Sequence, residues 1–402
     1  MDEFVVHNVR IVRSGQGIHE GYLRVEHGRI ADVGCGNPPD ANNGARIDGG
    51  MGLLSPGLVD IHTHGIHAFN YDRGPDHLVD ASEVLGRYGT TTVVPTIVPS
   101  SDSRFIESLS AFASAIPGIT NVSIPGIHLE GPFVAIAGAA CETRDGDLGL
   151  LNELLGACED RVAVMSIAPE VPGIIPVIET LVSKDVVPFI THTRASVEQT
   201  LAAIDAGARH ATHFYDVFPV PEETDPGVRP VGAVETILAD PRATCDFICD
   251  GVHVNPMAIR AAVAANGWEG VSLITDASFG AGLGPGRFDT PWGYSVEVQP
   301  GDAPRIADAD HPMRGGLAGS ALTMDKGLRN LLGWLDLPAQ QVWAMATCNP
   351  SRVIGAETKG DLDVGMDADM VLWREDGGAL SVERTWVAGR VVYDSAASDP
   401  VV

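Results

Sequence analysis

The feature that most constrains the fold is a regular alternation, from residue 53 to about residue 277, of short β-branched runs with segments of helical periodicity. Eight runs have the composition of strands, at residues 58–62, 91–96, 123–130, 162–168, 186–192, 210–213, 245–250 and 271–276. Strands separated by helices pair in parallel, because each helix returns the chain to the same end of the sheet. Eight such units predict an α/β fold, a (β/α)8 barrel of the TIM type.

The segment 196–207 shows how the sequence encodes a helix between two of these strands. Ser196 and Gln199 have the spacing of a capping box, in which each side chain bonds to the backbone N–H of the other residue. Gly207 suits the left-handed conformation in which many helices end. A helix is therefore predicted between Ser196 and Gly207.

Both ends of the chain have a different pattern, in which apolar and polar residues alternate over short runs separated by turn residues. Such alternation is typical of strands with one buried face. We predict a small β-sandwich domain built from residues 1–52 and 358–402, beside a barrel domain of residues 53–357. The stretch 278–319 is rich in glycine and proline and is longer than most connections, so it is predicted to cover the substrate.

Composition excludes several classes of partner. The chain has 402 residues, of which 45% are hydrophobic, enough for a large core. Its formal net charge of -27 repels nucleic-acid backbones and anionic membrane surfaces, so a small-molecule substrate is expected instead. The N-terminus lacks a basic segment followed by an apolar core, and no uncharged apolar run approaches the ~18 residues that span a bilayer. A cytoplasmic protein is predicted. Six cysteines without Cys-x-x-Cys spacing argue against a disulfide framework and a structural zinc site.

Residues that bind metals occur at the ends of the predicted strands. The carboxyl ends of barrel strands meet at one rim, so residues far apart in sequence converge there. The candidates for metal ligands are His62, His64, Glu130, His192, His213 and Asp276. His62 and His64 are two residues apart and therefore share a face of their strand. Imidazoles and carboxylates suit zinc or ferrous iron, and one or two divalent metal ions are predicted.

Such a site suits hydrolysis. Water bound to a divalent cation loses a proton near neutral pH and becomes the nucleophile. A neighbouring carboxylate can accept that proton and deliver it to the leaving group, and Asp276 is the candidate for this role. It follows an apolar strand, where burial of a charge is costly unless a metal or a donor compensates. The alternative is that Asp276 caps the N-terminus of a helix.

Six motifs occur in one order along the chain: PGLVDIHTHG at 56–65, GIHLEGPF at 126–133, ATHFY at 211–215, DGVHV at 250–254, TDA at 275–277 and LAGS at 317–320. They resemble the amidohydrolase superfamily and, within it, the N-acetylglucosamine-6-phosphate deacetylases. The resemblance implies a homodimeric, metal-dependent enzyme that cleaves the amide of an N-acetylated amino sugar and releases acetate and the free amine.

The resemblance also implies roles for individual residues. Glu130, His192 and His213 hold the principal metal, and His62 and His64 complete a second, more variable site. Asp276 acts as the general acid and base. The substrate contacts His253 near its acyl carbonyl, and further contacts are expected at Cys141, Glu142, Asp216, Val217 and Leu317.

The chain departs from the family where the sugar and its phosphate bind. Residues 139–142 (AACE) stand where the family has a Lys-Gly-Ala-His segment, and Asp216 and Val217 replace an Asn-Ala pair that contacts phosphate. A basic residue that relatives supply across a dimer interface is replaced near residues 222–224. Each close like charge costs a phosphate dianion about 1 kcal/mol or more at a partly exposed site. An unphosphorylated or cationic N-acetylated amino sugar is therefore expected.

Two other functions remain compatible with these residues. The same barrel and metals could open a cyclic amide or cleave an N-acyl amino acid, and an assay for acetate distinguishes these reactions from deacetylation. A barrel can also be kept as a non-catalytic scaffold. A scaffold should contain no stoichiometric metal.

Overall fold

A computed structural model describes residues 3–38, 44–100 and 104–397. Eight parallel strands form the central sheet, in an order that follows the chain. They are β6 (Leu58–Thr63), β9 (Thr90–Ile97), β10 (Ile127–Leu129), β11 (Val162–Ile167), β12 (Val187–Ile190), β13 (His210–Ala211), β14 (Thr244–Ile248) and β15 (Val271–Ile274). Each strand lies within or overlaps one of the eight predicted runs. Backbone hydrogen bonds from Asp276 N to His62 O and from His64 N to Ala277 O, both 2.8 Å, join the ends of the last and first strands.

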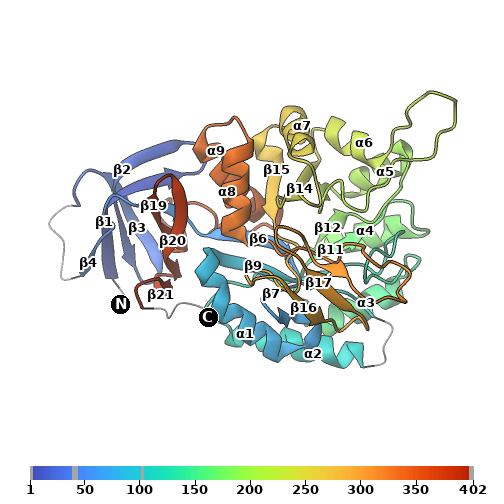
Figure 1. Ribbon diagram of the computed structural model, residues 1–402, viewed down its shortest axis with the longest axis horizontal. Helices are drawn as coiled ribbons and strands as arrows, with labels where there is room; N and C mark the ends of the chain where they lie inside the picture. Colours follow the sequence, from blue (N-terminus) through green and yellow to red (C-terminus); the bar gives the residue numbers. More distant parts are fainter. Residues whose placement is uncertain (1–2, 39–43, 101–103, 398–402) are drawn as a thin grey trace.

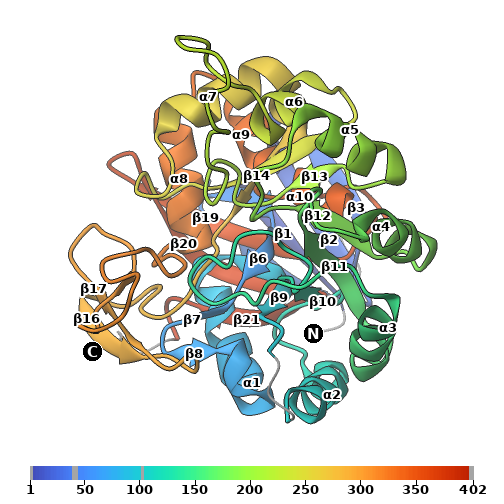
Figure 2. The same ribbon diagram turned by 90° about the vertical axis from the view of Figure 1, so that its right-hand side faces the viewer.

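Helices surround this barrel, as Figure 2 shows. They are α1 (Pro75–Leu85), α2 (Phe105–Ala115), α3 (Leu148–Ala157), α4 (Ile174–Ser183), α5 (Val197–Ala206), α6 (Ala233–Ala239), α7 (Pro256–Asn266), α8 (Met324–Trp334), α9 (Ala339–Met345) and α10 (Cys348–Val353). In α5 the predicted capping box forms between Ser196 and Gln199, and Gly207 ends the helix in the left-handed conformation. Short 3-10 turns lie at η1 (Tyr71–Arg73), η2 (Gly86–Tyr88), η3 (Ile116–Gly118) and η4 (Trp268–Gly270). Throughout the described parts of the chain, every helix is too short or too polar to cross a lipid bilayer.

The two ends of the chain pair into one eight-stranded sheet beside the barrel, drawn in blue and dark red in Figure 1. Its strands are β1 (Glu3–Arg13), β2 (Gly17–Glu26), β3 (Arg29–Cys35), β4 (Ala45–Asp48), β5 (Leu53–Pro56), β19 (Met370–Asp376), β20 (Ala379–Val387) and β21 (Arg390–Asp394). The predicted barrel with a small β-sandwich domain from both chain ends is confirmed. β5 pairs with β19 in this sheet, although it lies just past the predicted boundary at residue 52. The division of the chain near residues 52 and 358 stays a prediction.

Tryptophans join the two domains. Trp373, in β19, is fully buried and donates its Nε1–H to Ser55 Oγ at 2.9 Å. Its ring meets the ring of Trp343, in α9, edge to face with centroids 5.2 Å apart. Large buried aromatic contacts of this kind contribute strongly to packing, so the barrel and the small sheet share one hydrophobic interface.

The stretch after β15 has secondary structure of its own. It forms a three-stranded antiparallel sheet of β16 (Gly286–Asp289), β17 (Ser295–Val298) and β18 (Arg305–Ile306). Phe279, Tyr294, Val296 and Ile306 form a small apolar core beneath it. The hairpin of β7 (Gly65–Ile66) and β8 (Phe69–Asn70) contacts this stretch through the bond from His67 N to Ala281 O. The connection is therefore attached to the rim of the barrel.

Candidate metal and catalytic site

The six candidate metal ligands meet at one rim, although they come from five strands. His62 lies in β6, and His64 follows that strand directly. The other four follow their strands within two residues: Glu130 after β10, His192 after β12, His213 after β13 and Asp276 after β15. All six are buried, with exposed fractions of 7% or less. The carboxyl ends of the strands thus bring together the residues that the sequence predicted there.

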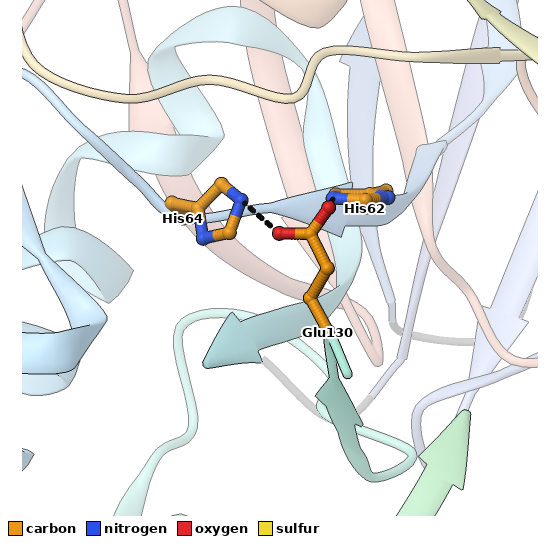
Figure 3. A group of neighbouring side chains, drawn as sticks. All are labelled: His62, His64 and Glu130. Atoms are coloured by element: carbon orange, nitrogen blue, oxygen red, sulfur yellow. Dashed lines mark ion pairs between the residues drawn. The ribbon is translucent and has the colours of Figure 1, made fainter. Parts of the chain in front are cut away.

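The Glu130 carboxylate lies at the centre of four imidazoles. Its Oε1 is 3.6 Å from Nε2 of His62, 3.3 Å from Nε2 of His192 and 3.2 Å from Nε2 of His213. Its Oε2 is 3.1 Å from Nε2 of His64. Figure 3 shows both β6 histidines pointing toward this carboxylate. One carboxylate therefore contacts ligands from three other strands.

Hydrogen bonds on the far side of three imidazoles orient their Nε2 atoms inward. The Nδ1 contacts are His62 with Thr212 Oγ1 at 2.8 Å, His192 with Ile136 O at 2.7 Å, and His213 with Asp216 O at 3.2 Å. An imidazole whose outer nitrogen donates to a carbonyl keeps its inner nitrogen free to bind a cation. This arrangement is the one found around metal-binding histidines.

The backbone turns sharply where three of these residues leave their strands. His192, His213 and Asp276 have φ angles of 47°, 35° and 47°, in the left-handed region. Residues other than glycine rarely adopt this conformation, and when they do they are often at functional sites. In this conformation His192 and His213 reach Glu130, and Asp276 reaches His64.

The charges of the cluster favour a cation. Burial alone would raise the pKa of Glu130, but the charge of His62 and hydrogen bonds from His192, His213 and His64 outweigh it and hold the pKa well below its usual range. Burial likewise opposes protonation of His64 and His213, yet the carboxylates prevail. They raise the pKa of His64 well above its usual range and that of His213 to about 9. Because these imidazoles must lose their protons to bind a metal ion, binding of a divalent cation here would release protons.

Two trios of buried residues have the spacing of a metal site. One ligand atom from each of His62, His64 and Glu130 lies within 4.8 Å of the others, and so does one from each of Glu130, Cys141 and His192. His62 Nε2, which faces Glu130, is buried without a hydrogen-bond partner. Buried polar atoms are rarely left unpaired, so this nitrogen is suited to bind a cation. The residues present are therefore suited to hold a divalent cation.

Asp276 completes the cluster. Its Oδ1 lies 3.4 Å from Nε2 of His64 and 3.7 Å from Nε2 of His62. The alternative role as a helix cap is wrong, because the next α-helix begins at Met324, with Thr323 at its N-cap. Asp276 stands at the rim of the barrel and faces His62 and His64.

Two buried aspartates that the sequence analysis missed support the rim from below. Asp60 accepts hydrogen bonds from Thr275 Oγ1 at 2.5 Å and from Thr275 N at 3.2 Å, next to Asp276. Asp246 accepts from His213 N at 2.6 Å and contacts His210 Nε2 at 2.9 Å. Burial raises the pKa of Asp60 to about 7, against the effect of its hydrogen bonds. For both aspartates, the sequence feature that could have revealed them is a single acidic residue within a strand that is largely apolar.

Asp246→Ala is expected to weaken metal binding about 10- to 100-fold, because the loss of a group that orients a metal ligand typically lowers metal affinity by that factor. The substitution leaves the buried His213 N–H without its acceptor. Asp246→Asn keeps an oxygen there and should recover most of the affinity. Competition with a chelator measures the metal affinity, and thermal unfolding checks that both variants fold. An alanine variant with wild-type affinity would refute this role for Asp246.

The candidate metal ligands lie at a cavity of about 230 Å³. Most residues predicted to contact the substrate line it: Cys141, Asp216, Val217, His253 and Leu317. Glu142 instead lines two neighbouring cavities, and the fully buried His62 lies beneath the wall. Trp292 and Met313, from the stretch after β15, close the cavity on another side. Trp292 was not predicted, because only the fold of that stretch brings it within 6.1 Å of the His64 ring.

His253 faces the same cavity and is held by Asp250. Its Nδ1 lies 2.7 Å from Asp250 Oδ2, and its backbone N–H donates to Asp250 Oδ1 at 3.0 Å. Burial alone would lower the pKa of His253, but the bond and charge of Asp250 prevail and raise it. The bond to Asp250 therefore fixes the imidazole in place, and the raised pKa stabilises the protonated form, in which Nε2 can donate a hydrogen bond to a ligand.

Comparisons with known proteins agree with this geometry. The profile of the amidohydrolase family matches residues 53–392. N-acetylglucosamine-6-phosphate deacetylase of Vibrio furnissii is 32% identical over 352 residues, which cover 86% of this chain and 84% of the relative. N-acetylgalactosamine-6-phosphate deacetylase of Escherichia coli O157:H7 is 31% identical, covering 84% and 87%. A mutant of N-acetyl-D-glucosamine-6-phosphate deacetylase from Mycobacterium smegmatis, in complex with N-acetyl-D-glucosamine-6-phosphate, superposes with a TM-score of 0.83 at 30% identity, covering 97% and 98%. The resemblance seen in the motifs is confirmed, and the chain belongs to the amidohydrolase family.

Proposed function

We propose that this amidohydrolase removes the acetyl group from an N-acetylated amino sugar, releasing acetate and the free amine. The observation that carries the proposal is the convergence of four imidazoles and two carboxylates from five strands on one cavity. The relatives named as amino-sugar deacetylases support the same reaction. Neither the opening of a cyclic amide nor a non-catalytic scaffold is favoured by the comparisons.

Glu130, His192 and His213 would hold the principal cation, with His62 and His64 at a second position. A bound divalent cation supplies a Lewis acid for the acyl carbonyl and activates water. Asp276 Oδ1 accepts the proton of the attacking water and returns it to the leaving nitrogen, which turns a poor leaving group into a neutral amine. This kind of general acid and base catalysis requires a carboxylate that can reach both the attacking water and the leaving nitrogen. Asp276, at the rim of the barrel, is the candidate for that carboxylate.

His253 and Trp292 would prepare the substrate for this proton transfer. His253, held by Asp250, can donate a hydrogen bond to the acyl oxygen as negative charge develops on it. Trp292 covers the cavity from the stretch after β15, and its Nε1 donates to the half-buried Asp72 at 2.9 Å, which fixes the ring. A covered cavity excludes bulk water and strengthens these electrostatic interactions.

Within this class of substrates, we propose that the amino sugar lacks a phosphate group. The described residues that line the cavity include three carboxylates, Glu130, Asp216 and Asp276, but no lysine or arginine. A phosphate dianion in this cavity would meet three carboxylates, and no lysine or arginine among the described lining residues could pair with it. We therefore favour an unphosphorylated or cationic N-acetylated amino sugar.

A comparison of two substrates tests this proposal. Acetate release from N-acetylglucosamine is expected to have a higher kcat/KM than release from its 6-phosphate. Asp216→Asn should raise kcat/KM for the phosphorylated sugar about fivefold, because about 1 kcal/mol of repulsion is removed. Asp225→Asn, an exposed position outside the cavity, should change neither value. Much faster turnover of the 6-phosphate would contradict the proposal, and ring opening without acetate would contradict the reaction itself.

Three further features belong to this proposal. The nitrogen and oxygen ligands suit zinc or ferrous iron, in one or two ions. We also propose a homodimer, as the family resemblance implies, and a cytoplasmic location, where the six free cysteines would stay reduced. Elemental analysis, sedimentation velocity and cell fractionation test these features separately.

A further inference from the structure

Cys141 lies unusually close to the candidate metal ligands. Its Sγ is within 4.8 Å of both a carboxylate oxygen of Glu130 and a ring nitrogen of His192. The side chain is buried, with a residue exposure of 6%, and it lines the cavity. The Sγ also lies 3.6 Å from the backbone oxygen of Glu130, to which the thiol donates. The thiol thus contacts the cluster that would hold the cation.

The loop that carries Cys141 also orients His192. Ile136 O accepts from His192 Nδ1 at 2.7 Å, while Ile136 N donates to His192 O at 3.1 Å. A turn then brings Cys141 back, with its N–H bonded to Ala137 O at 2.9 Å. Gly138 passes so close that a Cβ there would lie 2.5 Å from His192 Cε1. The imidazole and the thiol are therefore placed by one continuous segment.

The spacing is close to that of ligands on a common ion. Zinc binds sulfur at about 2.3 Å, nitrogen at about 2.0–2.1 Å and carboxylate oxygen at about 2.0–2.2 Å, so two ligands of one tetrahedral ion lie about 3.5 Å apart. The three atoms of this trio lie within 4.8 Å of one another, so side-chain movements of about 1 Å would bring them to that spacing. Other buried cysteines, such as Cys158 at the C-cap of α3, belong to neither metal-binding trio.

We propose that the Cys141 thiolate is a ligand of the principal cation in the substrate-free enzyme, together with Glu130, His192 and His213. The S–H proton leaves to solvent as the bond between sulfur and the cation forms. A carboxylate, two imidazoles and a thiolate form a four-ligand set that selects zinc over harder cations. Because a catalytic zinc site keeps one position open, the thiol must leave that position before the amide is cleaved. Cys141 therefore closes the resting site.

Cobalt substitution tests this proposal, which rests on the metal site proposed above but needs no substrate. The protein is stripped of metal, loaded with one equivalent of Co²⁺, and its absorption spectrum is recorded. The wild-type protein should show an intense thiolate-to-cobalt charge-transfer band in the near ultraviolet. Cys141→Ser should lose the band and bind zinc at least about tenfold more weakly, whereas the matched control Cys158→Ser should keep both.

The outcomes separate this proposal from the proposed function. If cobalt binds stoichiometrically to the wild-type protein without a thiolate band, or if the band survives in Cys141→Ser, Cys141 is not a ligand although the metal site stands. If cobalt does not bind at all, the metal site and the proposed function both fall. Thermal unfolding shows whether the serine variant folds, and the wild-type spectrum decides the question even if that variant does not.

Discussion

Glu130→Gln is expected to remove the bound metal and to lower acetate release at least about a thousandfold. The Glu130 carboxylate contacts His62, His64, His192 and His213. Glutamine has the same shape but no charge, so it cannot offset the charge of a cation among these imidazoles. Loss of metal catalysis removes several kcal/mol of transition-state stabilisation, and about 4 kcal/mol corresponds to a thousandfold. Elemental analysis and an acetate assay measure the two effects.

The matched control for this change is Glu179→Gln, at an exposed position of α4. It removes the same charge from the chain without touching the cluster, so metal content and activity should stay at wild-type values. A Glu130→Gln protein that keeps one metal per chain and more than a tenth of the activity would refute the central place given to this carboxylate.

Asp276→Asn is expected to lower kcat about 10²- to 10⁴-fold, the range that a general acid and base contributes. Metal content should be nearly unchanged, because Glu130 and its histidines remain. The strand end should also stay in place, since its bonds from Asp276 N to His62 O and from Ser320 N to Asp276 O use only backbone atoms of Asp276. An effect on kcat with little change in KM identifies an interaction made mainly in the transition state.

Asp80→Asn, on the exposed face of α1, is the control for the loss of a negative charge. It should leave kcat unchanged. If Asp276→Asn instead lost its metal in parallel with its activity, the carboxylate would be primarily a metal ligand. If it kept full kcat, the proton transfer assigned to Asp276 would be wrong.

The barrel was predictable from the sequence because each of its strands is marked by a local pattern of residues. Runs of β-branched residues recur at regular intervals, and parallel strands of a barrel must end at one rim. The convergence of Glu130, His192 and Asp276 follows from this geometry without knowledge of any contact. The lengths of the strands were less predictable. In the run 123–130 only Ile127–Leu129 forms a strand, since Ser123 makes just an isolated bridge with Thr92 and Pro125 has no N–H to donate.

The supporting residues and the cavity walls could not be predicted in the same way. Asp246 matters because it bonds to His213, which follows the neighbouring strand β13, and no local pattern records that pairing. Trp292 reaches His64 only because the stretch after β15 folds back over the rim. Glu142 lies one residue beyond Cys141 but lines other cavities, since the loop turns between them. Loop conformation depends on contacts that are distant in sequence.

A crystal structure of the zinc-loaded enzyme, with anomalous scattering recorded at the zinc edge, would show whether side chains from separate strands hold a common cation at one rim. We expect an anomalous peak at about 2.0–2.2 Å from Glu130, His192 and His213. Zinc bound in stoichiometric amount at any other place, with the rim free of anomalous density, would contradict this expectation.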